Sequence, residues 1–206
     1  SVEIDELKNI VPYMDNFKWY FYYNQDHFQN WNLTKKYDVL VYGGNDNINY
    51  PLRHRLLKIL LFLEKQNRIN LRWIKSSENI TEANLSKEIN QSYLTVACKT
   101  LKHDRFLGKY QEIPLSYSCI LGNIPTRYRN LLQDNMIEVD LNMNDSTITN
   151  IILSTLKDKQ TILDKTDRLY DKFKNMLYYQ HGKKDFENIN NSIQKKIKGG
   201  NSFNPN

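Results

Sequence analysis

Residues 101–125 read LKHDRFLGKYQEIPLSYSCILGNIP, and the fold of the chain can be worked out from this segment outward. Its first half gathers charge, because Arg105, Lys109 and Glu112 lie within eight residues, with Gly108 between them. Its second half turns to apolar and small side chains, which are typical of a strand covered on both faces. The segment therefore predicts a short helix that starts among cations and is followed directly by a buried strand.

The charges of this segment suit a nucleotide. Helix N-termini favour anions because their first N–H groups are unpaired and the helix dipole points that way. Arg105 and Lys109 are four residues apart, so they share a face of a helix and add positive charge for a phosphate. The Glu112 carboxylate suits the hydroxyls of a sugar. The alternative is an ordinary surface cluster of ion pairs, but Gly108 and the strand that follows favour a binding site.

Apolar strands and amphipathic helices alternate on both sides of this segment. Strands are predicted at residues 37–44, 70–75, 92–98, 118–123 and 136–140, and helices at 50–67, 81–89, from Pro125, from Asn144 or Asp145 to 156, and at 160–179. This alternation predicts an α/β fold: a Rossmann-like, mostly parallel sheet flanked by helices, with a helical C-terminal extension. We expect the ligand at the carboxyl ends of the strands.

A second anion-binding element precedes the segment. The predicted strand YDVLVYGG ends in Gly43 and Gly44, and the next helix opens at Pro51 with Arg53 and Arg55 in its first turn. A strand, a glycine turn and a basic helix start form an anion site of the doubly wound type, although the G-x-G-x-x-G fingerprint is absent. The alternative is that both arginines are solvated, which their position at a helix start, where cations are disfavoured, makes a weaker interpretation.

The segment at 101–125 resembles the donor-binding segment in the C-terminal domain of GT-B-type glycosyltransferases. That segment reads roughly R-x-x-x-K-x-x-E, followed by small residues and glycine, and features between residues 37 and 155 resemble the same domain in the same order. The resemblance implies one half of a GT-B fold and transfer of a sugar from a UDP- or GDP-linked donor. It implies no cofactor and no metal. The absence of an Asp-x-Asp motif agrees with this.

The resemblance also implies roles for individual residues. Arg105 and Lys109 would be catalytic, because they would neutralise the donor diphosphate, and Glu112 would hold the ribose hydroxyls. One departure concerns the residues after Glu112, where the family often has Ala-x-x-Gly and this chain has Leu-Ser-Tyr-Ser. The glycine that lets backbone approach the ligand would then be missing, or displaced to Gly122.

The remaining implied contacts come from loops that follow the first two strands. Gly43 and Gly44 would lie against the donor, and Arg53 is the residue that we match to the diphosphate-binding cation, ahead of Arg55. Ser76 and Ser77 would contact the nucleobase, mostly through their backbone.

The predicted domain organisation leaves the enzyme incomplete. Residues 1–36 form an N-terminal extension or interdomain segment, residues 37–180 the donor-binding domain, and residues 181–206 a basic, flexible tail. The first residue is serine, so we expect an excised domain. The catalytic base and the site for a glycan, lipid or protein acceptor would come from an N-terminal domain or a partner chain. The sequence has no signal-peptide pattern and no apolar run near 18 residues, so we expect a cytoplasmic protein, or one held peripherally at a membrane.

Composition leaves two other functions open. The chain is 40% hydrophobic and 25% charged, as in globular proteins, and its net charge of +6 suits an anionic ligand, an anionic surface or RNA. The same site residues would serve a non-catalytic nucleotide-binding module. An RNA-binding protein would use the Lys-rich tail and the aromatic run FKWYFYY at residues 17–23 as a stacking platform, but this run lacks interleaved basic residues apart from Lys18 and reads better as a packed strand. We therefore do not expect nucleic acid as a partner. Cys98 and Cys119 are predicted to be reduced, buried thiols.

Overall fold

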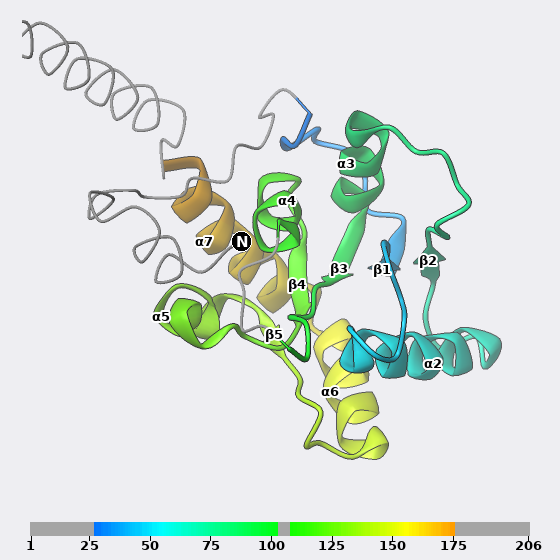
Figure 1. The fold of residues 1–206 in the computed structure, drawn as a ribbon. Coiled ribbons are helices and arrows are strands. Elements are labelled where there is room, and N and C mark those ends of the chain that lie inside the picture. Colours follow the sequence, from blue (N-terminus) through cyan, green and yellow to red (C-terminus); the bar gives the residue numbers. More distant parts are fainter. Residues whose placement is uncertain (1–26, 103–107, 176–206) are drawn as a thin grey trace, which may run out of the picture. The chain divides into compact units, whose positions relative to one another are not determined.

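A computed structural model of the chain describes residues 27–102 and 108–175 (Figure 1). These residues belong to one compact unit, Tyr23–Met176. The predicted aromatic strand at 17–23 and the predicted tail at 181–206 lie outside the described residues, and the predicted domain bounds stay predictions. In the described ranges, no helix is both long enough and apolar enough to cross a membrane.

Strands and helices alternate along the described chain, as the sequence predicts. The strands are β1 (Tyr37–Val41), β2 (Leu71–Trp73), β3 (Ser92–Val96), β4 (Cys119–Gly122) and β5 (Ile137–Glu138). The helices are α2 (Pro51–Lys65), α3 (Glu82–Asn90), α4 (Lys109–Leu115), α5 (Arg129–Leu132), α6 (Asp145–Lys157) and α7 (Lys159–Asn175). Two 3-10 turns, η1 (Thr126–Tyr128) and η2 (Gln133–Asn135), flank α5. The helix predicted to start at Pro125 is thus a 3-10 turn followed by a single α-helical turn.

The strands form one five-stranded sheet in the order β2-β1-β3-β4-β5, with every pair of neighbours parallel. The predicted Rossmann-like α/β fold is therefore confirmed. The chain leaves β1 through α2 to reach the edge strand β2, then crosses back through α3 to β3 on the other side of β1 (Figure 1). This reversal of direction places a topological switch point between the carboxyl ends of β1 and β3, where doubly wound sheets bind their ligands.

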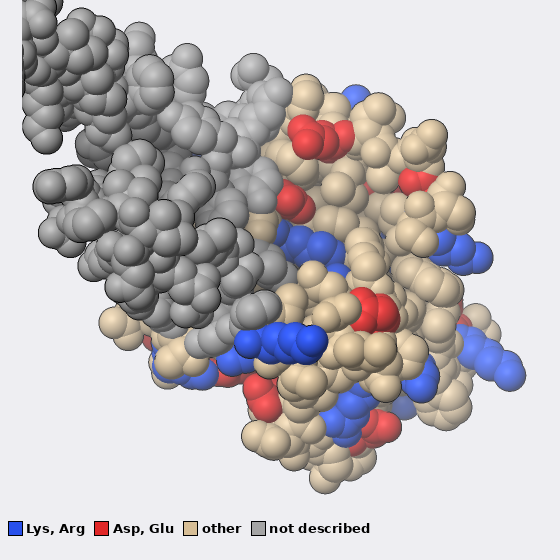
Figure 2. Space-filling model, viewed as in Figure 1, with Lys and Arg blue, Asp and Glu red and all other residues tan. Residues whose placement is uncertain are grey.

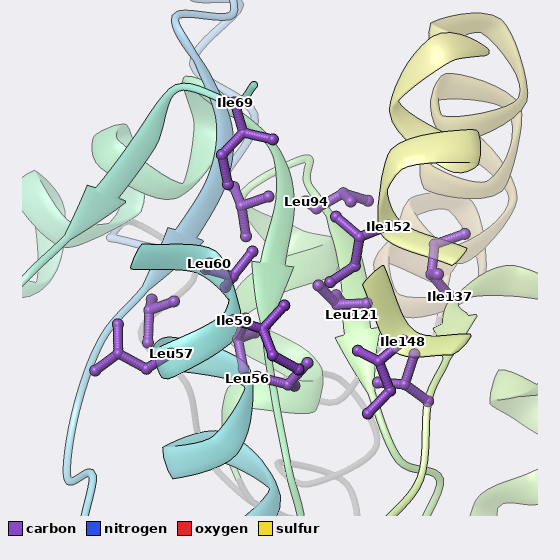
Figure 3. Close-up of a cluster of buried hydrophobic side chains, with 14 of the residues drawn as sticks. Leu56, Leu57, Ile59, Leu60, Ile69, Leu94, Leu121, Ile137, Ile148 and Ile152 are labelled. Atoms are coloured by element: carbon purple, nitrogen blue, oxygen red, sulfur yellow. The ribbon is translucent and has the colours of Figure 1, made fainter. Parts of the chain in front are cut away.

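Helices cover both faces of the sheet. Successive residues of a strand point to opposite faces, so Val39 and Val41 belong to one core cluster and Leu40 and Tyr42 to the other. The first cluster lies between the sheet and the helices α2 and α6, and Figure 3 shows Ile59 of α2 and Ile152 of α6 close to Leu121 of β4. The second cluster includes residues of α3, α4 and α7. Because both faces are buried, the centres of β1 (Val39–Val41) and β4 (Cys119–Leu121) are apolar and fully buried.

The polar residues predicted to begin the helices do so. The side chain of Thr81 accepts a hydrogen bond from the backbone N–H of Asn84 at 3.3 Å and caps α3. Asn144, rather than Asp145, caps α6, because its side chain accepts from the backbone N–H of Thr147 at 2.8 Å. Such caps satisfy N–H groups that the first helical turn leaves unpaired.

At the amino ends of the strands, Lys35 binds the segment before β1 to the chain at the starts of β3 and β4. Its Nζ donates to the backbone carbonyls of Asn90 at 2.7 Å, Ser92 at 2.9 Å and Tyr117 at 2.5 Å. An ammonium group has three N–H donors, so these carbonyls use all of them. Burial lowers the pKa of Lys35 to about 7, and the nearby Cys119 acts weakly in the opposite direction.

We expect the free energy of unfolding to rise with pH between pH 7 and 9 because of Lys35. An unfolded lysine keeps its proton to about pH 10.4. In this range the unfolded chain therefore binds more protons than the folded chain, and the gain is on the order of 2 kcal/mol by pH 9. Urea unfolding at pH 7, 8 and 9 measures this rise in the free energy of unfolding.

Lys35→Met should flatten the pH dependence of the free energy of unfolding, whereas Lys36→Met, at the exposed neighbouring position, should keep it. An unchanged slope in Lys35→Met would refute the assignment.

Candidate anion site at the end of β1

Arg53 lies in the first turn of α2 with its guanidinium buried beneath the β1–α2 loop. Its side chain is 2% exposed and donates to the carbonyl of Gly44 at 2.5 Å and, over a longer 3.4 Å, to that of Cys98. The guanidinium carbon lies 4.1 Å from the ring centroid of Tyr50. These contacts tie the end of β1 to the end of β3. The Nε of Arg53 is also buried, and among the residues that the structure describes it has no hydrogen-bond partner.

Arg55, two residues further along α2, has a different environment. Its Nε pairs with the Asp145 carboxylate at 2.5 Å, and its NH1 donates to the carbonyl of Leu141 at 2.9 Å. It therefore links α2 to the start of α6 and not to the end of β1. The choice of Arg53 as the site residue stays a prediction, whereas the interpretation of Arg53 as a solvated residue is wrong, because the residue is buried.

Lys109, the first residue of α4, brings a second cation to the end of β1. Its Nζ donates to the carbonyl of Tyr42 and lies 3.7 Å from the centroid of the Tyr42 ring. Burial and the nearby Arg53 guanidinium lower the pKa of Lys109 well below its usual value, while Glu112 and Cys98 act in the opposite direction. Two cations from helices far apart in the sequence thus lie close enough to influence each other.

Glu112 lies in the first turn of α4, one helical turn from Lys109. Its Oε2 accepts a hydrogen bond from the Tyr42 hydroxyl at 2.6 Å. Tyr42 therefore contacts both charged residues, through its carbonyl and ring on one side and its hydroxyl on the other. We did not predict Tyr42 from the sequence. The available signal was its position in the predicted strand, directly before the two glycines that end it.

The two glycines after β1 have different roles. Gly43 has a positive φ of +76°, and a Cβ there would lie 2.8 Å from Nζ and 3.2 Å from Cε of Lys109. A Cβ added to Gly44 would lie 4.0 Å from Tyr50 Cε2 and would meet no other atom of the described residues within that distance. Gly43 thus leaves room for the Lys109 ammonium, whereas Gly44 contributes its carbonyl to Arg53.

Gly122 lies where β4 approaches the end of β3, and its predicted role toward the ligand stays a prediction. A Cβ on Gly122 would lie 1.7 Å from the carbonyl oxygen of Ala97, so this glycine is required by the close approach of β4 to the end of β3. The position after α4 is held by Tyr117, which has a positive φ of +60°. The N–H groups of Tyr117 and Ser118 donate back to Pro114 and Ile113, the pattern of a helix end at which glycine is usual.

Two other predicted residues, Ser76 and Ser77, are not joined to the described part of this cluster. Arg105 lies outside the described residues. Ser76 and Ser77 are exposed in a turn after β2, at the same edge of the sheet, and neither side chain has a hydrogen bond to the described residues of the cluster. Their proposed contacts with the nucleobase stay predictions.

The cysteines agree with their predicted state. Cys98 and Cys119 are free and buried, and burial raises the pKa of each thiol to about 12. Across the described residues, no group of three His, Cys, Asp or Glu side chains could hold a metal ion.

Charge on the visible surface is mixed. Figure 2 shows Lys and Arg side chains alternating with Asp and Glu groups over this face, rather than forming one continuous basic patch. The features that suggested RNA binding, the aromatic run at 17–23 and the Lys-rich tail, lie outside the described residues.

Comparisons with known proteins leave the family open. No family model matches the chain, and no curated protein matches it. Among solved structures, one similar chain belongs to the "Crystal structure of GtfA/B complex", with a TM-score of 0.42 and 10% sequence identity over 75% of this chain. The present chain spans 38% of the length of that chain. A likeness of this size shows neither a family nor an activity.

Proposed function

We propose that the chain binds the diphosphate of a nucleotide sugar at the end of β1 and acts as the donor-binding domain of a glycosyltransferase. The observation that carries the proposal is the meeting of Arg53 and Lys109 around Gly43, at the switch point of a parallel sheet. Two neighbouring cations repel each other, and an anion with two negative groups would relieve that repulsion. A diphosphate has this charge and could also accept from the unpaired Nε of Arg53.

Glu112 extends the site beyond the diphosphate. A carboxylate repels phosphate but accepts hydrogen bonds from hydroxyl groups. Since Tyr42 holds Glu112 beside Lys109, the ribose of the nucleotide is the part of the ligand that Glu112 would bind. Arg105, Ser76 and Ser77 remain proposed contacts of the diphosphate and the base.

The chemistry that follows is transfer of the sugar. An acceptor oxygen attacks the anomeric carbon, the bond from that carbon to the phosphate oxygen breaks, and the bonding electrons leave with the nucleoside diphosphate. Negative charge grows on the leaving diphosphate, so cations fixed beside it lower the barrier. The acceptor oxygen loses its proton to a base, which we assign to an acceptor-binding domain or partner chain.

The direct test is isothermal titration of the purified chain with UDP, GDP and their sugars, without added metal. We expect micromolar binding of one nucleotide family. We also expect proton uptake on binding, because a bound anion should raise the lowered pKa of Lys109 toward its usual value. Repeating the titration in buffers with different ionisation enthalpies measures the uptake.

The outcomes separate the functions that the composition leaves open. Tight binding together with sugar transfer to an acceptor supports the glycosyltransferase, while binding with no turnover in any acceptor or partner mixture supports a nucleotide-binding module. A folded chain that binds neither UDP, GDP nor their sugars would overturn the proposal. Salt-sensitive binding to an oligonucleotide would then point to RNA.

A further inference from the structure

Two buried polar atoms, one in the β1–α2 loop and one in the first turn of α2, lack hydrogen-bond partners within the described part of the chain. One is Nε of Arg53, a donor, and the other is Oδ1 of Asn45, an acceptor. They lie in one small region, because Arg53 donates to the carbonyl of Gly44, the residue before Asn45. Buried polar groups are rarely left unpaired, so each such atom calls for an explanation.

The loop that presents Asn45 is held in place by its own contacts. Asp46 accepts at 2.6 Å from the backbone N–H of Asn49, and the carbonyl of Asn49 accepts from the N–H of Leu101 at 2.9 Å. The carbonyl of Asn45 itself lies 3.3 Å from Nδ1 of His54. Because these hydrogen bonds hold the backbone at Asn45 and after it, the position of the Asn45 side chain is fixed by the loop.

The contacts follow an order along the end of β1. Glu112 accepts a hydrogen bond from the Tyr42 hydroxyl, and Lys109 donates one to the Tyr42 carbonyl. Arg53 donates one to the Gly44 carbonyl. Asn45 comes next in the chain. A nucleotide sugar with its ribose at Glu112 and its diphosphate across Lys109 and Arg53 would therefore extend toward Asn45 with its sugar end.

We propose that Oδ1 of Asn45 accepts a hydrogen bond from a hydroxyl of the donor sugar, while Nε of Arg53 donates to the adjoining phosphate oxygen. This inference rests on the proposed function. A sugar phosphate offers both partners at once, a hydroxyl hydrogen and a phosphate oxygen, and these are the two groups that the orphaned atoms require. Asn45 then distinguishes a nucleotide sugar from the nucleoside diphosphate alone.

The test compares ligands with and without the sugar in matched variants. Titrations of the full chain with UDP, GDP, UDP-glucose, UDP-galactose, UDP-N-acetylglucosamine and GDP-mannose would be run on the wild type, Asn45→Ala and Asn47→Ala. Asn47 is an exposed asparagine of the same loop. Asn45→Ala should weaken binding of the preferred nucleotide sugar about tenfold. The affinity of Asn45→Ala for the nucleoside diphosphate should stay within about twofold of the wild type. Asn47→Ala should change the affinity for neither ligand.

A further variant separates hydrogen bonding from loop structure. Asn45→Asp keeps an acceptor oxygen, so it should weaken both ligands through its negative charge and preserve the ratio of their affinities. If Asn45→Ala lowers the affinity for both ligands equally, Asn45 only supports the loop. If it lowers the affinity for neither ligand, water is the hydrogen-bond partner of Oδ1. Both results overturn the inference and leave the proposed function standing. If no diphosphate binds the wild type, both fail together.

Discussion

Gly122→Ala is expected to lower the free energy of unfolding by more than about 3 kcal/mol. The added Cβ would lie 1.7 Å from the carbonyl oxygen of Ala97 and 2.8 Å from its carbonyl carbon. These are backbone atoms, and they cannot turn aside as the end of a side chain can. The same region holds the sheet together, since the N–H of Ala97 donates to Leu121 and the N–H of Val139 donates to Gly122.

Urea unfolding followed by circular dichroism measures this loss. Because small domains are stable by only about 5–15 kcal/mol, the variant should unfold at a much lower urea concentration or fail to accumulate. Gly44→Ala is the comparison, since its added Cβ meets no described residue closer than 4.0 Å, and this variant should cost little stability. Equal stability of the two variants would contradict the close approach of β4 to β3.

Lys109→Met is expected to weaken binding of the nucleoside diphosphate by on the order of a hundredfold. Methionine has a similar length but no charge, so it removes a charge-assisted hydrogen bond to phosphate, which contributes about 1.5–3 kcal/mol. If the chain supports transfer, the rate should fall on the order of 10²–10³-fold, as for other groups that stabilise a transition state. The proton uptake on binding should also disappear, because its source would be gone.

Two other variants make this prediction specific. Lys102→Met alters an exposed lysine of the same segment and should leave binding within about twofold. Gly43→Ala should reproduce part of the loss without touching a charge, since its Cβ would displace the Lys109 ammonium and its φ of +76° disfavours a side chain. Unchanged affinity in Lys109→Met would remove this lysine from the site, and with it the main support for diphosphate binding.

Much of the fold can be predicted from the sequence because its signals are local. Apolar runs such as YDVLVYGG and SYLTVAC are strands with both faces buried, and the spacing of Leu56, Ile59, Leu60 and Leu63 indicates the buried face of a helix. Pro51 and Thr81 begin their helices by backbone chemistry that involves only neighbouring residues. Less was predictable where a short segment has weak propensity, as after Pro125, where a 3-10 turn and a single α-helical turn take the place of the expected longer helix.

The candidate site was predictable only in part. Gly43, Arg53, Lys109 and Glu112 stand out because charges and glycines follow apolar strands. Tyr42 and Asn45 do not, since a tyrosine at a strand end and an asparagine in a polar loop are common in any fold. Their importance comes from contacts with residues distant in the sequence, such as the hydrogen bond between the Tyr42 hydroxyl and Glu112.

The sequence by itself determined that this chain alternates strands and helices into a parallel α/β sheet, and that cations cluster at helix starts. It left Arg53 and Arg55 nearly equivalent, because both lie in one helical turn. Only the tertiary structure decided between them: Arg55 meets Asp145 of α6, whereas Arg53 lies with Lys109 around the end of β1. The physical reason is that strand order, which no local pattern encodes, determines which helix starts converge.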